Sequence, residues 1–131
     1  MEAAIGLVEF NSIAVGVEAA DAMLKAAMVD LIVSRPICPG KYVVLITGDV
    51  AAVKSSVKAG VEKGQGAVID EFVLPNVHPT VIPAITTTSA VTQVEALGVI
   101  ETYSIASLVV AADTAVKAAE VVDECIQKVA T

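Results

Sequence analysis

The sequence predicts an α/β protein of the α+β type, with one complete β-α-β-β-α-β unit followed by an incomplete β-α half-repeat. Three observations support this fold class. Short apolar runs typical of strands alternate with longer segments whose apolar residues recur at helical spacing. A good capping residue precedes the helical segments. The opening strand-and-helix pattern also returns near the end of the chain, which marks an internal duplication.

The internal repeat relates residues 4–27 to residues 96–119. Gly6 aligns with Gly98, so the offset is 92 residues, and roughly half of the aligned positions are identical. A period this long does not suit a solenoid and indicates the tandem duplication of a whole domain. The second copy, however, contains only the first strand and the first helix of the unit.

The first predicted strand covers residues 3–10, where apolar side chains predominate. Ser12 is a good N-cap for the helix that follows. One face of that helix is polar and carries Asp21 and Lys25 at i,i+4 spacing, which favours an ion pair. The opposite, apolar face comprises Ile13, Val17, Ala20 and Leu24.

Two strands and a rigid turn occupy the middle of the unit. Residues 30–34 form a short predicted strand, and residues 41–47 form a buried one. Between them, residues 35–40 read RPICPG, and the two prolines and the glycine predict a stiff turn. This turn presents Cys38 between two prolines.

A second helix and a fourth strand complete the unit. Asp49 caps the helix, and Gly64 and Gly66 end it. Its apolar stripe comprises Val50, Val53, Val57 and Val61. Residues 67–74 then form the fourth strand, and the resulting order is that of the ferredoxin-like split unit.

The remainder of the chain is a tail, a linker and the half-repeat. Residues 75–85 form a proline-punctuated tail, and residues 86–93 form a linker. We predict that the last helix continues past Ala119, because no turn signal follows. The domain organisation is then a complete domain over 1–91, with a linker and an incomplete second repeat (strand and long helix) over 92–131. The apolar face of the last helix comprises Val109, Val116, Ala119 and Ile126.

Composition excludes several classes of protein. The chain has 131 residues, 56% of them hydrophobic, a net charge of −7 and a mean hydropathy of +0.78. No uninterrupted apolar run reaches a membrane span, and no signal peptide is predicted. The acidic balance argues against nucleic acid and against anionic membranes. One small domain cannot hide this much apolar surface, so we expect a homo-oligomer.

The two cysteines, Cys38 and Cys125, indicate reduced thiols in the cytosol, with Cys125 as a small buried side chain.

The motifs resemble those of the bacterial microcompartment shell proteins. The similar segments are IGLVEFNSIAVGVEAADAMLKAA, ITGDVAAVKSSVKAG and EFVLPNVHPTVIPAI, which cover most of the first domain. The segment SRPICPGKYVV is similar to that of a tandem-domain, iron–sulfur branch of the family, from microcompartments for propanediol utilisation. The resemblance implies a ferredoxin-like microcompartment domain with a structural role, in which rings with a central pore tile edge to edge around enzymes.

The resemblance also implies roles for individual residues. Cys38 would lie at the central pore and bind a [4Fe–4S] cluster shared between subunits. Lys25 would lie at the assembly edge between neighbouring rings. The pore loop would comprise Ile37, Pro39, Gly40 and Lys41.

The implied partners are copies of the same chain, other shell proteins and encapsulated enzymes, in the shell of a cytoplasmic microcompartment. The related branch has two complete domains per chain and forms a trimer that mimics a hexamer. Here the second repeat lacks its pore loop, so a hexamer and a pseudohexameric trimer both stay open.

Simpler interpretations stand beside these roles. Cys38 can be a free turn cysteine, since a lone cysteine carries no ligand spacing. Gly40 can serve only to provide a positive φ. Lys25 can sit on a solvated helix face, and His78 is best explained as a turn residue. No enzyme motif is present, so we predict no enzymatic activity. The alternative functions are a small-molecule-binding regulatory oligomer and, less well supported, a thiol-dependent enzyme.

Overall fold

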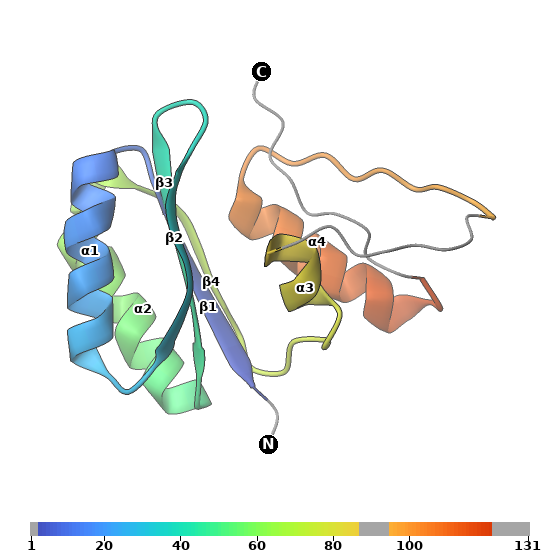
Figure 1. Cartoon of the computed structure of the whole chain (residues 1–131), viewed down its shortest axis with the longest axis horizontal. Helices are drawn as coiled ribbons and strands as arrows, with labels where there is room; N and C mark the ends of the chain where they lie inside the picture. The colour runs from blue at the N-terminus through green and yellow to red at the C-terminus, as the bar shows by residue number, and fades with distance from the viewer. Residues whose placement is uncertain (1–2, 87–94, 122–131) are drawn as a thin grey trace.

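The computed structural model describes residues 3–86 and 95–121, and these form one antiparallel sheet covered by helices on both faces (Figure 1). The strand order is β2-β3-β1-β4. The predicted β-α-β-β-α-β order is present, and the structure has the mixed α/β architecture that the sequence predicts. The elements are β1 (Ala4–Phe10), α1 (Ile13–Ala26), β2 (Asp30–Ile37), β3 (Lys41–Gly48), α2 (Val50–Gly64), the 3-10 helix η1 (Gln65–Ala67), β4 (Val68–Leu74), α3 (Val81–Thr86) and α4 (Ile105–Ala118).

The central strand β1 is buried along its whole length, because helices cover both of its faces. Alternate side chains of a strand point to opposite faces of the sheet. Val8 and Phe10 therefore join the core beneath α1 and α2, whereas Ile5 and Leu7 join the core beneath α4. The result is two apolar layers on one sheet rather than one.

The first layer depends on small residues that let α1 and α2 approach the sheet and each other. A Cβ added at Gly60 of α2 would lie 2.6 Å from the sulfur of Met23 on α1. Ser56, fully buried, donates a hydrogen bond of 2.9 Å to the Met23 carbonyl. The predicted N-caps are confirmed, since Ser12 accepts from the Val15 N–H and Asp49 accepts from the Ala51 N–H. As predicted, α2 ends at Gly64.

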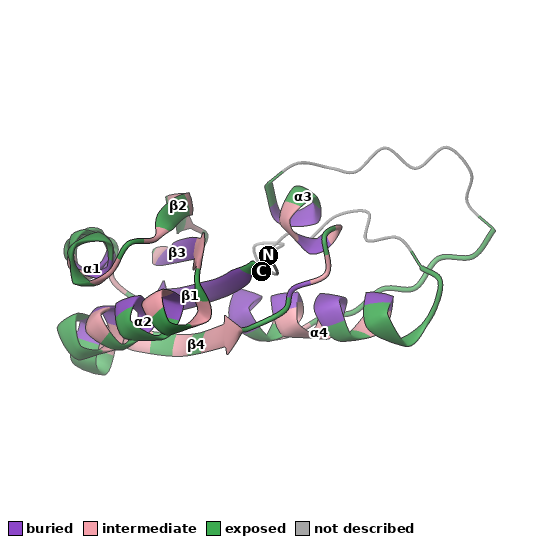
Figure 2. Ribbon diagram, turned by 90° about the horizontal axis from the view of Figure 1, so that it is seen from below, coloured by how far each residue is buried: buried purple, intermediate pink, exposed green. Residues whose placement is uncertain are grey.

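The second layer is formed by α4 together with the segment that follows β4 (Figure 2). Figure 2 shows the buried residues of α4 along one side of the helix, with α3 on the same side of the sheet. The buried residues of α4 are Ile105, Ala106, Val109, Ala112, Asp113 and Val116.

Four details differ from the sequence prediction. The strand β2 extends to Ile37, so Arg35 and Pro36 belong to it rather than to the turn. An edge strand tolerates proline because one side of it has no hydrogen-bonding neighbour. A short helix, α3, forms within the proline-punctuated tail, where Val81 and Ile85 are buried. The other two differences concern the second repeat.

The predicted strand of the second repeat is absent, because residues 95–103 pair with no other strand and are mostly exposed. Its counterpart β1 is stabilised by ladders to β3 and β4, and the described part of the second repeat contains no equivalents of these. The helix α4 also ends at Ala118 rather than continuing, with Ala119 in an extended conformation. Beyond Val116 no side chain up to Val121 is buried, so no packing supports further helix. Cys125 and Ile126 lie outside the described residues.

The N-terminal end of α4 is attached to β4 through Asp70. Ser104, the N-cap of α4, donates a hydrogen bond to Asp70, and the Ser107 hydroxyl donates another of 3.1 Å. Burial alone would raise the pKa of Asp70, but hydrogen bonds from Ser104, the Glu71 N–H and Ser107 together hold the pKa below its usual value. The ionised carboxylate therefore stabilises the docked helix.

Shortening a side chain in the second layer tests its contribution to stability. Leu45 on β3 is fully buried in the core that includes α4, whereas Leu31 on β2 is 44% exposed. We expect Leu45→Ala to lower the free energy of unfolding by about 2–5 kcal/mol. Leu31→Ala should change it by less than about 0.5 kcal/mol. Urea titrations followed by circular dichroism measure both, and equal losses would contradict this description of the core.

Acid should weaken the attachment of α4 through Asp70. Because its pKa is lower in the folded chain, Asp70 contributes stability above its unfolded pKa, and this is lost as the pH falls through the folded pKa. Unfolding free energies measured by urea titration between pH 7 and pH 3 should therefore fall less steeply for Asp70→Asn than for the parent chain. Parallel profiles would show that Asp70 does not hold α4.

Candidate functional site

The tip of the β2–β3 hairpin carries the predicted pore residues. Cys38, Pro39 and Gly40 form the turn and are exposed, while Ile37 and Lys41 form the last pair of the two strands and are half-buried. Gly40 has a φ of +65°, so the prediction that it supplies a positive φ is confirmed. Figure 1 shows this turn projecting beyond the end of α1.

A buried tyrosine fixes the base of this hairpin. The Tyr42 hydroxyl shares a hydrogen bond of 2.8 Å with the Ser34 hydroxyl across the two strands. The Tyr42 ring also lies against α1 at Gly16, where an added Cβ would come within 2.5 Å of the ring. The hairpin is therefore tied to the first helix, and the tip is presented on a supported base.

The chemistry available at the tip is that of one exposed thiol. Cys38 forms no disulfide. Within residues 3–86 and 95–121, no three His, Cys, Asp or Glu side chains are grouped so that they could hold a metal ion. A [4Fe–4S] cluster usually takes four thiolates. Among the residues that the structure describes, the donor set of one chain thus fits such a cluster only as one ligand among several.

The predicted edge residue Lys25 lies in the last turn of α1, far along the helix from its N-cap. Its ammonium group is 2.6 Å from the Asp21 carboxylate, and both side chains are more than half exposed. An ion pair this exposed contributes only tenths of a kcal/mol. Several large apolar residues are also exposed on this helix, namely Ile13, Val17 and Leu24.

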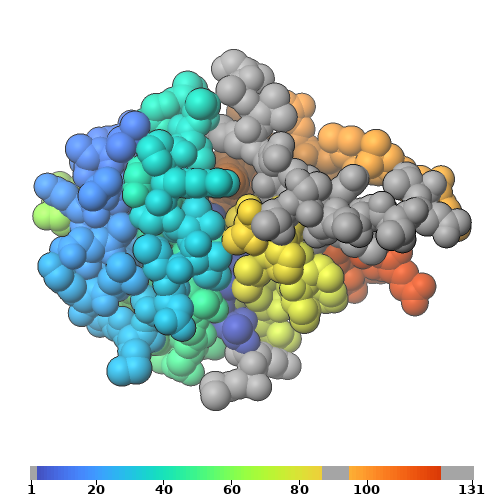
Figure 3. Space-filling view, viewed as in Figure 1, coloured from blue at the N-terminus to red at the C-terminus, as the bar shows by residue number. Residues whose placement is uncertain are grey.

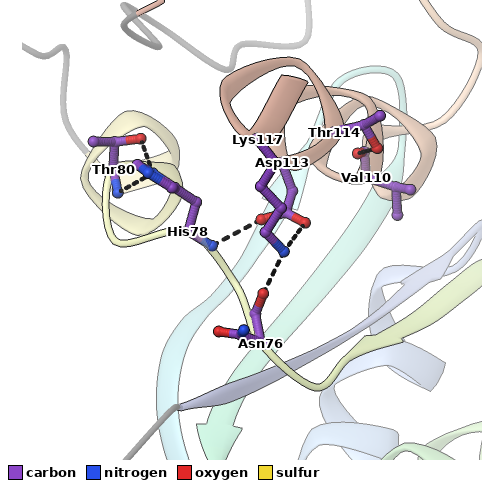
Figure 4. A network of polar contacts seen from close by, with 7 residues as sticks. All are labelled: Asn76, His78, Thr80, Val110, Asp113, Thr114 and Lys117. Carbon is purple, nitrogen blue, oxygen red and sulfur yellow. Dashed lines mark hydrogen bonds and ion pairs between the residues drawn. The ribbon is translucent and has the colours of Figure 1, made fainter. Parts of the chain in front are cut away.

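The corresponding ion pair of α4 is part of a polar network (Figure 4). Asp113 is almost fully buried; one of its oxygens accepts from the His78 N–H at 2.8 Å and the other lies 2.7 Å from the Lys117 ammonium. Lys117 also donates to the Asn76 carbonyl. The network fixes the C-terminal half of α4 to the chain that follows β4.

His78 has a local role in this network. Its Nδ1 lies 2.8 Å from the Thr80 hydroxyl, two residues along the chain (Figure 4). The His78 carbonyl accepts a hydrogen bond of 3.0 Å from the Val81 N–H, so His78 begins a turn, as predicted. Figure 3 shows α3 lying beside the β2–β3 hairpin on one face of the molecule. A shallow hollow of about 250 Å³ lies between Thr86 and β2.

Asp70, Asn76 and the backbone of His78 bind the second repeat, although no sequence pattern predicted these contacts. The helix side of these contacts was visible, because Ser104, Asp113 and Lys117 are identical to their counterparts in the first repeat. The strand side carried no signal, since these are long-range contacts that no local pattern reveals. A second hollow, of about 280 Å³, lies beside Asp70 between β4 and α4.

Comparisons with known proteins agree with the fold and with the repeat. The profile of the BMC domain matches residues 4–77 and again residues 96–128. The bacterial microcompartment shell protein PduT of Citrobacter freundii is 47% identical over 121 residues, which cover 92% of this chain and 66% of that protein. The carboxysome shell protein CcmK2 of Thermosynechococcus vestitus is 38% identical over 82 residues, covering 60% of this chain and 80% of that protein.

A solved structure is similar over most of the chain. A crystal structure of a microcompartment protein from Desulfitobacterium hafniense DCB superposes with a TM-score of 0.79 at 63% identity, covering 89% of this chain and 65% of that one. The chain thus spans about two thirds of the length of its PduT relative and of this structure. These relatives place it in the microcompartment shell, and none of the helices described here has the length and apolar character of a membrane span. The chain belongs to the BMC domain family of bacterial microcompartment proteins.

Proposed function

We propose that this chain is a structural subunit of a microcompartment shell that self-assembles into ring-shaped tiles, with the β2–β3 tip at the central pore. The family membership carries the shell role, since its relatives are named as shell proteins. The exposed turn formed by Cys38, Pro39 and Gly40 supports the pore assignment, because a projecting loop can converge with its copies on a symmetry axis. Other shell proteins and encapsulated enzymes would be its partners, and the chain itself would have no enzymatic activity.

The same tip can hold an iron–sulfur cluster only through symmetry. Three-fold convergence brings three Cys38 thiolates together and leaves one iron of a [4Fe–4S] cluster for another ligand. Six-fold convergence brings six thiolates to a wider opening, where the geometry is less suitable. When bound, the cluster would supply a one-electron redox couple at the pore. The chain's own contribution is an accessible sulfur on a turn whose base is tied down by Tyr42.

Native mass spectrometry of anaerobically purified protein, run beside Cys38→Ala, tests whether the tip holds a cluster and how many copies form the oligomer. We expect an oligomer of the parent chain to carry extra iron and sulfide mass, and the variant to lose that mass while keeping the oligomer. This follows because Cys38 supplies the thiolate but none of the core packing. A trimer and a hexamer are distinguished by the same spectrum. Bare polypeptide mass in both samples would leave Cys38 as a turn residue of a plain tile.

Reversing a charge on α1 tests the assembly edge. We expect Lys25→Glu to abolish the ordered arrays that the parent chain forms in negative-stain electron microscopy, because a basic side chain at the contact between copies becomes acidic. Lys54→Glu on α2 makes the same charge change at another exposed helical site and should leave the arrays intact. Arrays that survive Lys25→Glu would remove the edge assignment. Closed oligomers of the parent chain that never associate laterally would instead support the regulatory alternative.

A further inference from the structure

The two repeat-related helices of this chain occupy different environments. The helix α1 spans residues 13–26 and α4 spans residues 105–118, so the two have the same bounds at the repeat offset of 92. The residues that α4 buries against the sheet correspond to residues that α1 exposes to solvent, except for Ala112 and its counterpart Ala20, which are both buried. The three large apolar pairs, with the exposed fraction of each residue, are Ile105 at 6% and Ile13 at 43%, Val109 at 0% and Val17 at 53%, and Val116 at 8% and Leu24 at 41%.

The polar groups of the docked face are also repeated on α1. Asp113 and Lys117, which bind the His78 N–H and the Asn76 carbonyl, correspond to Asp21 and Lys25. On α1 the same pair is fully formed, with 2.6 Å between the charged atoms, but both side chains are exposed. Ser104, which donates to Asp70, likewise corresponds to the N-cap Ser12.

We propose that α1 of a second copy docks on the surface that α4 covers within its own chain, and that α4 acts as a built-in competitor for that surface. The surface consists of the sheet face at Leu7 and Leu45, the carboxylate of Asp70 and the backbone of residues 76–78. This inference rests on the proposed self-assembly and gives Lys25 a candidate partner in another copy, the Asn76 carbonyl.

A second copy is the occupant because the structure already shows this surface binding a helix with the same side chains. Docked α1 would place Asp21 on the His78 N–H and Lys25 on the Asn76 carbonyl, so neither backbone group would lose its partner. It would also bury the exposed Val17, which otherwise costs free energy in water. One contact would be lost, since Ser107 corresponds to Val15, which has no hydroxyl for Asp70.

The competition has a direct consequence for assembly. An attached helix competes at a high effective concentration, so α4 wins when the protein is dilute. A helix from another copy wins only as the concentration rises or as the attachment of α4 weakens. The contacts of α4 therefore set the concentration at which copies associate.

Matched double variants of the full-length chain distinguish the contribution of α1 to association from that of α4. Association is measured by sedimentation velocity over a concentration series. D113A/K117A weakens the attachment of α4 and should lower the concentration needed for association by about tenfold or more. D21A/K25A removes the equivalent groups of α1 and should raise it by a similar factor. K58A/E62A removes an exposed ion pair of α2 with the same spacing and should change nothing.

Two further variants keep the test decisive if a double variant unfolds. Ser107→Ala weakens only α4, because α1 has no hydroxyl at this position, and should promote association. Val17→Glu should prevent association while the monomer melts at the parent temperature, because Val17 is exposed there.

Three outcomes would overturn the inference. Weaker association of D113A/K117A would mean that α4 of one copy docks on the sheet of another copy and so joins them. Unchanged association of Val17→Glu and D21A/K25A would mean that α1 makes no such contact, and the shell role would stand if tiles still formed. If both the parent chain and its Ser107→Ala variant stay monomeric at all concentrations, the inference and the proposed tile are both wrong.

Discussion

The structure depends on one constraint, which is that each face of the sheet carries an apolar core. Every residue of β1 is buried, so neither face can be left to water. The β-α-β-β-α-β unit covers one face with its two helices, α1 and α2, and leaves the other face to the segments that follow β4. Helix α4 and the segment after β4 provide the missing cover, and their apolar residues merge with Leu7 and Leu45 into one core. Burial of this second face is what gives the short second repeat a structural role within the chain.

Polar contacts decide where on this face α4 lies. Apolar packing is not directional, so a helix on a flat apolar sheet could slide without much loss. Asp70 holds the N-terminal end of α4 and the backbone near His78 holds its C-terminal half, which fixes both position and direction. Because Asp113 is nearly fully buried, its two hydrogen-bonded partners are needed to offset the cost of removing a carboxylate from water. Ser104, Asp113 and Lys117 of the second repeat correspond to Ser12, Asp21 and Lys25 of the first. The exposed face of α1 therefore carries polar groups that can fix a docking position, in addition to its apolar side chains.

The sequence was sufficient for features that depend on local chemistry. The caps Ser12 and Asp49, the apolar strands and the positive φ of Gly40 all follow from neighbouring residues. It was insufficient where a tertiary partner decides. Residues 95–103 have the pattern of a strand but pair with none of the strands in the described part of the chain. Pro36 looks like a turn residue but is tolerated in a strand because β2 lies at the sheet edge. The role of the tip at Cys38 is the extreme case, because it depends on other copies of the chain.

The tip and the exposed face of α1 share a single support. Tyr42 packs against Gly16 in the first turn of α1, and its hydroxyl ties β3 to β2 below the turn that carries Cys38. Gly16 faces the core, whereas Val17, the next residue, faces outward on the same helix. A contact that fixes α1 against another copy therefore also fixes, through Tyr42, where the hairpin lies relative to that copy. The position of the Cys38 thiol at a shared axis is then a consequence of the packing between copies. A chain whose sheet face is covered by its own α4 presents the same tip, but no contact with another copy fixes where that tip lies.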